Sequence, residues 1–189
     1  MKTQQKTKTS STTAAPSQIA SPALQKPQAE HEWLQQFVGE WESKTESHLD
    51  PDREPEISTA VERIRPLGRF WIVNEIDAVM FGAPFHGIQT LGYDPKKKTF
   101  VGTWVDSVSS FVWTYQGKLN RERTALTFYS EGPCPNTPDR LTKIKDVLEI
   151  IDKNHKLYAS YILDNHGDWT LCMEARGVLK RRSGSVTSV

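Results

Sequence analysis

The chain has 189 residues, of which 37% are hydrophobic and 10% aromatic, so it can build the core of one domain but not comfortably two. Its net charge of +1 hides a division, because residues 1–30 and 180–189 carry +3 each and leave −5 on the body between them. An acidic body argues against a nucleic-acid-binding core, which needs a basic face.

The first 29 residues are mainly Thr, Ser, Gln, Lys, Ala and Pro and predict a disordered tail. They lack the apolar stretch of a secretion signal, and no run of about 18 apolar residues occurs in the chain. We therefore expect a cytoplasmic protein without a membrane span. Apolar residues then recur at helical spacing from His31 to Val38 and stop at Gly39, which predicts one short amphipathic helix.

The period of the sequence becomes two after the helix. The even-numbered residues from 42 to 48 are charged or histidine, whereas the odd-numbered ones are Trp41, Ser43, Thr45 and Ser47. This alternation predicts a strand with a charged outer face and a small, polar inner face. Because Val, Ile and Leu dominate packed sandwich cores, such an inner face favours a barrel that leaves space inside.

Further strands, separated by Gly-, Pro- and Asp-containing turns, follow to the end of the ordered region. We expect them near residues 56–65, 69–80, 85–93, 99–106, 110–117, 124–131, 141–151, 156–163 and 169–179. Many short strands without a second long helix predict an all-β meander, and closure would remove its exposed edges. The predicted fold is thus a closed antiparallel up-and-down β-barrel of about ten strands with one short N-terminal helix. The predicted organisation is a tail over 1–29, a barrel domain over 30–182 and a disordered tail over 183–189.

The pentapeptide Phe-Val-Gly-x-Trp occurs twice, at residues 37–41 and 100–104. A helix followed by Gly39-x-Trp41 resembles the signature of the calycins, which include lipocalins and fatty-acid-binding proteins. Further matching segments are Gly82-x-Pro84-Phe85-x-Gly87, Leu91-Gly92-Tyr93-Asp94-Pro95 and Val101-Gly102-Thr103-Trp104-Val105-Asp106-Ser107. Together they resemble a bacterial family of uncharacterised proteins, domain of unknown function 1579, which is placed among calycin-like barrels and has no assigned activity.

The resemblance implies structural roles at one end of the barrel. In calycins the signature tryptophan packs near that end, and an arginine from the last strand often lies over it. The matching residues here are Gly39 and Trp41, and the arginine would be Arg176 or Arg181. We favour Arg176, because it lies within the predicted last strand. A haem-binding calycin branch, the nitrobindin type, takes its iron ligand from a histidine on the last strand. Residues 169–180 contain no histidine, so we expect no cofactor.

The two cysteines, Cys134 and Cys172, have no partner at metal-ligand spacing, and the histidines are scattered. We therefore predict no metal site and expect free thiols. The proline-rich segment 131–138 predicts a loop in which Cys134 is exposed.

Aromatic residues gather on one face of two neighbouring predicted strands. Trp104 and Asp106 share a face of strand 99–106, and Trp113 and Tyr115 share a face of the next strand. Stacked side by side, they would form an aromatic wall of a ligand pocket. The alternative is that the aromatic side chains simply fill a small barrel.

Strand 69–80 leaves two orientations open. Trp71, Glu75 and Asp77 share one face, and the opposite face is more hydrophobic. If the hydrophobic face packs inward, the carboxylates are surface charges; if the barrel is wet inside, they face the ligand. A triad of His86, Asp106 and a nearby serine has no Gly-x-Ser-x-Gly motif to support it.

We predict a protein that binds an apolar or aromatic small molecule in the barrel interior, rather than an enzyme. The candidate ligand-binding residues are Trp71, Glu75, His86, Tyr93, Trp104, Asp106, Trp113 and Tyr115. One alternative is an enzyme that uses an interior carboxylate, or His86 with Asp106, on an unknown substrate. Another is a filled structural barrel that acts through partners, for which the interior should measure less than roughly 300 Å³.

Overall fold

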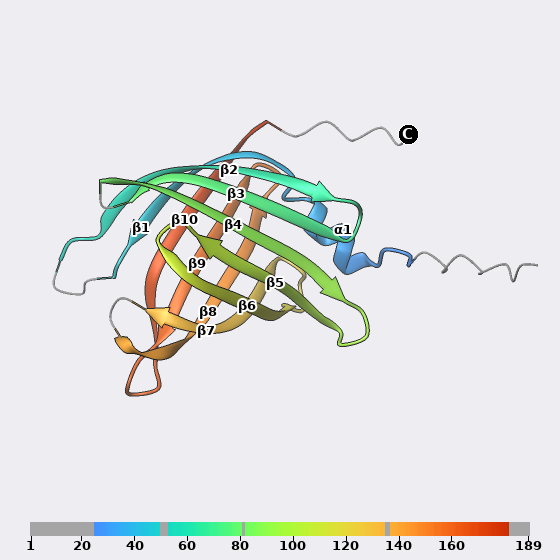
Figure 1. Ribbon diagram of the computed structural model, residues 1–189. Coiled ribbons are helices and arrows are strands. Elements are labelled where there is room, and N and C mark those ends of the chain that lie inside the picture. The colour runs from blue at the N-terminus through green and yellow to red at the C-terminus, as the bar shows by residue number, and fades with distance from the viewer. Residues whose placement is uncertain (1–24, 50–52, 81, 135–136, 182–189) are drawn as a thin grey trace, which may run out of the picture.

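The computed structural model describes residues 25–49, 53–80, 82–134 and 137–181. Its strands form one closed antiparallel barrel in the order β1-β10-β9-β8-β7-β6-β5-β4-β3-β2, so each strand pairs with its neighbours in sequence and β1 pairs with β10 to close the sheet. Figure 1 shows this barrel with the short helix α1 at one end. The predicted fold class is confirmed.

The elements lie close to their predicted positions. They are α1 (Ala29–Gln35), β1 (Gly39–Ser47), β2 (Glu56–Leu67), β3 (Trp71–Met80), β4 (Ala83–Asp94), β5 (Thr99–Asp106), β6 (Ser109–Leu119), β7 (Ala125–Cys134), β8 (Thr137–Asp152), β9 (His155–Leu163) and β10 (Trp169–Arg181). Most of the predicted N-terminal tail, residues 1–24, and all of the predicted C-terminal tail, residues 183–189, lie outside the described residues. In the part of the chain that is described, no helix has the length and apolar character needed to cross a membrane.

The hydrophobic core lies at the end of the barrel that carries α1. Trp33 and Leu34 of the helix pack with Phe37 and Trp41, and the last three are among the most completely buried side chains. Trp33 Nε1 donates to the carbonyl oxygen of Arg123 at 2.7 Å, and Trp41 Nε1 donates to that of Phe37 at 2.8 Å. Both indole N–H groups are thus satisfied inside an apolar cluster, which closes this end.

The two copies of Phe-Val-Gly-x-Trp use their glycines differently. Gly39 begins β1 with φ of 150°, a conformation that residues with a side chain rarely adopt. Gly102 lies in the middle of β5, where a Cβ atom would collide with the backbone carbonyl of Thr90 on β4. The first glycine therefore permits the change of direction into β1, and the second permits close approach of two strands.

Strand β1 has the two faces that its sequence predicts. Ser43, Thr45 and Ser47 are buried, whereas the alternating residues Glu42 and Lys44 are exposed. Ser43 and Thr45 also line the interior cavity. The small polar inner face is confirmed, and it contributes to leaving space inside the barrel.

Candidate functional site

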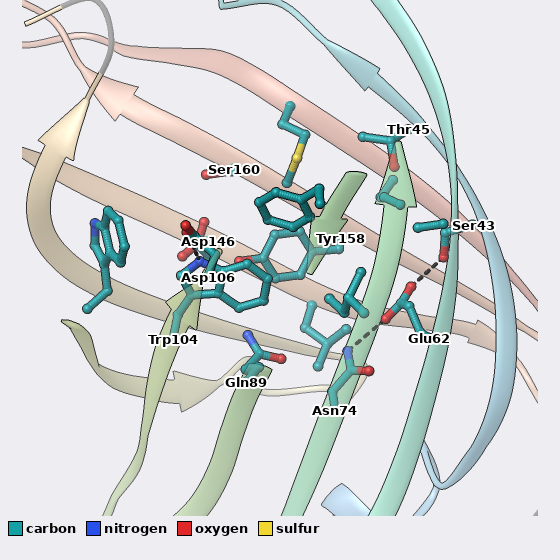
Figure 2. Close-up of a pocket in the computed structure, with 18 of the residues that line it drawn as sticks. Ser43, Thr45, Glu62, Asn74, Gln89, Trp104, Asp106, Asp146, Tyr158 and Ser160 are labelled. Atoms are coloured by element: carbon teal, nitrogen blue, oxygen red, sulfur yellow. Dashed lines mark hydrogen bonds between the residues drawn. The ribbon is translucent and has the colours of Figure 1, made fainter. Parts of the chain in front are cut away.

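The barrel encloses a cavity of about 630 Å³, to which every strand contributes side chains. Its lining is mostly apolar, with a small number of polar groups. Figure 2 shows several of these, including Glu62, Asn74 and Gln89, pointing into the same space. A volume of this size lies within the range of small-molecule sites and is about twice the limit set for a filled barrel.

One wall of the cavity is aromatic. Trp104 on β5 lies directly opposite Trp113 on β6, and both line the cavity. The ring of Phe85 on β4 stacks on that of Trp104, with 6.2 Å between centroids and 19° between planes. Two glycines leave room for the indoles, because a Cβ atom at Gly87 would meet Trp104 and one at Gly132 would meet Trp113. The predicted adjacency of these aromatic residues is present.

Asp106 holds this wall in position. Its Oδ2 accepts a hydrogen bond from Trp104 Nε1 at 2.9 Å. Its Oδ1 accepts the backbone N–H groups of Val108 at 3.0 Å and Ser109 at 2.8 Å, which fixes the turn between β5 and β6. Asp106 lines the cavity as predicted, and its hydrogen bonds orient the indole.

A buried ion pair lies in the cavity wall towards Trp41. Lys156 Nζ on β9 lies 2.5 Å from Glu62 Oε2 on β2, and the two side chains are only 4% and 8% exposed. Ser43 donates to Glu62 Oε1, and Asn74 Nδ2 donates to Oε2 at 2.8 Å. Burial opposes ionisation of Glu62, but the Lys156 ammonium and these hydrogen bonds outweigh it and hold the pKa of Glu62 below its usual range.

The cation over the Trp41 ring is Lys156 of the buried ion pair, on β9, and not Arg176 of the last strand, β10. Lys156 Nζ lies 5.3 Å from the centroid of the Trp41 ring. Arg176, which the calycin resemblance suggested for this place, is exposed on the outer face of β10 and pairs there with Glu174 at 2.6 Å. The structure thus corrects the expected partner of Trp41 while retaining a cation on its indole face.

A second buried carboxyl group, Asp146 on β8, has no cationic partner among the residues that the structure describes. Burial raises its pKa to about 6, and hydrogen bonds from Ser160 and Tyr158 on β9 oppose this rise only in part. Tyr158 and Gln89 are in turn hydrogen-bonded to Tyr115, and burial raises the pKa of both tyrosines far above the usual range. All of these side chains line the cavity.

Three polar atoms in the cavity lining have no hydrogen-bond partner among the described residues. They are Asn74 Oδ1, Ser130 Oγ and Asp146 Oδ1. Buried polar atoms are ordinarily paired, because an unpaired one loses its hydration without compensation. These atoms mark positions where a bound molecule could supply the missing hydrogen bonds.

The other four candidate ligand-binding residues lie outside the cavity lining. On β3, Trp71 packs over Gly92, and Glu75 lies 3.4 Å from Arg65. His86 Nδ1 is 2.6 Å from Asp77 Oδ1, and both side chains are about half exposed, so His86 pairs with Asp77 instead of Asp106.

Tyr93 belongs to the closed end of the barrel. Its ring packs against that of Phe100, and its carbonyl oxygen accepts a hydrogen bond from His31 Nε2 at 3.2 Å.

The more hydrophobic face of β3, which includes Ile72, Asn74 and Ile76, lines the cavity. The orientation with the carboxylates outside is therefore the observed one.

Both cysteines are free and buried, and both line the cavity. The expectation that Cys134 is exposed is wrong, because β7 continues through this residue. Burial raises the pKa of Cys172 to about 11. Among the described residues, no group of His, Cys, Asp and Glu side chains is arranged to hold a metal ion.

Sequence reasoning missed the buried charges of Glu62, Asp146 and Lys156. A usable signal was present, since each interrupts an alternating series of inward residues. Asp146 lies between Ile144 and Leu148, and these three line the cavity. An ionisable side chain in the inward phase of a predicted strand would have identified each of these positions.

Two solved structures share this fold. Rv2717c from M. tuberculosis is 12% identical, with a TM-score of 0.61 over 82% of this chain and 100% of that chain. The S-type phycobiliprotein lyase CPES from Guillardia theta is 15% identical, with a TM-score of 0.55 over 83% of this chain and 100% of the lyase chain. No curated protein matches the chain significantly in sequence. The model of the family described as "Protein of unknown function (DUF1579)" matches residues 26–178, and the chain therefore belongs to that family.

Proposed function

We propose that this protein binds a small molecule in the interior of the barrel, with a flat apolar or aromatic part of the ligand against Trp104 and Trp113. The observation that carries the proposal is a cavity of about 630 Å³ that combines an aromatic wall with unpartnered polar atoms. Ligand pockets have this composition, because apolar area provides affinity and a few polar groups fix orientation. The similar barrel of a phycobiliprotein lyase supports the fold that this proposal needs.

Native mass spectrometry of the purified protein tests the proposal directly. We expect a species heavier than the chain by the mass of one small molecule, which is lost on denaturation. A cavity-filling variant provides the decisive comparison. Ala60→Phe places a ring on the inner face of β2, whereas Thr59→Phe places the same ring on its exposed outer face.

The inner variant should lose the bound species and the outer one should keep it. Equal occupancy in both variants would show that the molecule binds elsewhere, and the proposal would then fail.

A second candidate function, catalysis, is favoured by one specific observation. The carboxyl group of Asp146 faces the cavity with its pKa raised by burial to about 6, which suits a general acid or base near neutral pH. If the co-purified molecule is converted on incubation with fresh protein and Asp146→Asn abolishes the conversion, the protein is an enzyme. An unchanged mass after incubation leaves binding as the function.

A further inference from the structure

The unpartnered atoms of the cavity are mainly hydrogen-bond acceptors. Asn74 Oδ1 is an amide oxygen and can only accept a hydrogen bond. Asp146 Oδ1 can likewise only accept when its carboxyl group is ionised, whereas Ser130 Oγ can accept or donate. Asn74 and Asp146 are 4% and 3% exposed, so solvent has little access to either. A ligand that completes these sites must therefore bring N–H or O–H donors.

The charges that line the cavity do not balance. Among the described residues, the lining contains the acidic Glu62, Asp106 and Asp146 and one basic residue, Lys156. Lys156 is held by Glu62, whereas Asp106 accepts hydrogen bonds from an indole and two backbone N–H groups. Asp146 receives only neutral hydroxyl groups. Asp106 and Asp146 thus both receive neutral donors only. Of the two, Asp146 is the one that is fully buried and keeps a carboxylate oxygen without a partner among the described residues, so a positive charge is needed most there.

In the described part of the chain, no other titratable group near Asp146 can neutralise it. The groups that interact with it are Tyr115 on β6, Tyr158 on β9 and Cys172 on β10. Each is an acid whose pKa burial raises above its usual value, so all three are neutral at pH 7. The described side chains of the neighbouring strands thus contribute no cation on this side of the cavity.

On the basis of the proposed binding function, we propose that the ligand is an organic cation, with a flat apolar body and a protonated nitrogen that donates a hydrogen bond to Asp146 Oδ1. A cation offsets the cost of keeping this carboxylate charged in an apolar cavity, and its N–H groups supply the missing donors. The aromatic wall adds a further attraction for positive charge. An anionic ligand of the same shape would meet the uncompensated carboxylate and be repelled.

Three probes of one shape test the charge preference. They are 1-naphthylmethylamine, which is protonated at pH 7.5, 1-naphthalenemethanol, which is neutral, and 1-naphthoate, which is anionic. Their dissociation constants are measured by isothermal titration calorimetry on the full chain after removal of any bound molecule. We expect the ammonium probe to bind wild type about tenfold to a hundredfold more tightly than the alcohol, the range of one charged hydrogen bond. The naphthoate should bind most weakly.

Asp146→Asn should abolish the preference for the ammonium probe and leave alcohol binding within about threefold of wild type. The matched control is Glu149→Gln, which removes a carboxylate that does not line the cavity from the same strand. This control should keep the full preference.

If the alcohol binds wild type as tightly as the ammonium, the cation proposal is overturned while cavity binding stands. If none of the three binds, both proposals fail. The ratio in wild type decides between these outcomes even if the Asp146 variant does not fold.

Discussion

Replacement of Asp146 by asparagine should make the empty protein more stable at neutral pH, because it removes an unneutralised buried charge. Asp146 is 3% exposed, and burial raises its pKa from the ordinary value of 3.8 to about 6. The folded state therefore binds the proton more tightly than the unfolded state does. Between these two pKa values the free energy of unfolding falls as the pH rises, and above pH 6 the full cost is present.

The size of the effect follows from the two pKa values. Their separation corresponds to about 3 kcal/mol, at 1.36 kcal/mol for each pH unit. Asparagine has no such titration, so the difference in free energy of unfolding between Asp146→Asn and wild type should be constant below about pH 3, where the carboxyl group is protonated in both states. It should then increase by about 3 kcal/mol towards pH 7 in favour of the variant. Other titrating groups contribute equally to both proteins and cancel.

Guanidinium denaturation of the ligand-free proteins at half-unit steps from about pH 3 to about pH 8 measures this difference, with tryptophan fluorescence as the readout. Glu149→Gln is the control for loss of a carboxylate from the same strand, and its difference from wild type should not follow the curve of Asp146. A difference between Asp146→Asn and wild type that is independent of pH would show that Asp146 has an ordinary pKa. The account of an uncompensated charge would then be refuted.

Other parts of the site lead to further predictions. Glu62→Gln or Lys156→Met alone should lower the free energy of unfolding by about 3–5 kcal/mol, since each variant leaves the remaining buried charge without its partner. The double variant Glu62→Gln/Lys156→Met should lose less than the sum of the single losses, and additive losses would contradict the pairing. Trp104→Ala should weaken binding of the naphthyl alcohol at least tenfold, whereas Trp71→Ala on the outer face should leave it unchanged; calorimetry compares the two. Cys172, with its raised pKa and 7% exposure, should react with a thiol reagent at pH 8 much more slowly in the native protein than in the unfolded one, and equal rates would contradict this.

The alternation of side chains made part of the site predictable. In β1 the charged residues and the small polar residues occupy separate faces, so the inner face could be assigned from sequence alone. Trp104 and Trp113 were paired correctly, because each lies in the aromatic phase of a strand and the strands are consecutive. On β3 the two faces are less distinct, and Trp71 and Glu75 were included among the ligand-binding candidates although their face is the outer one.

Arg176 shows why the last strand could not be assigned in this way. The register of β10 against β9 shifts between Leu171 and Met173, so Cys172 is an additional residue in the strand. Beyond this bulge the inward residues are Met173 and Ala175, which pair with the inward residues of β1. In a regular strand continuing from Cys172, Arg176 would point inward. A bulge reverses the phase, and no periodic pattern reveals its position.

The two buried carboxyl groups of the cavity have opposite environments, which indicates how a ligand would be oriented. Glu62 is neutralised by Lys156 and held by Ser43 and Asn74, so the wall near Trp41 has no net charge to satisfy. Asp146 has hydroxyl neighbours only, and its ionised form remains costly until a cation arrives. Figure 2 shows Glu62 and Asp146 on different sides of the cavity. A protonated nitrogen therefore gains most beside Asp146, and the apolar body of the ligand is left to occupy the remaining cavity and its aromatic wall.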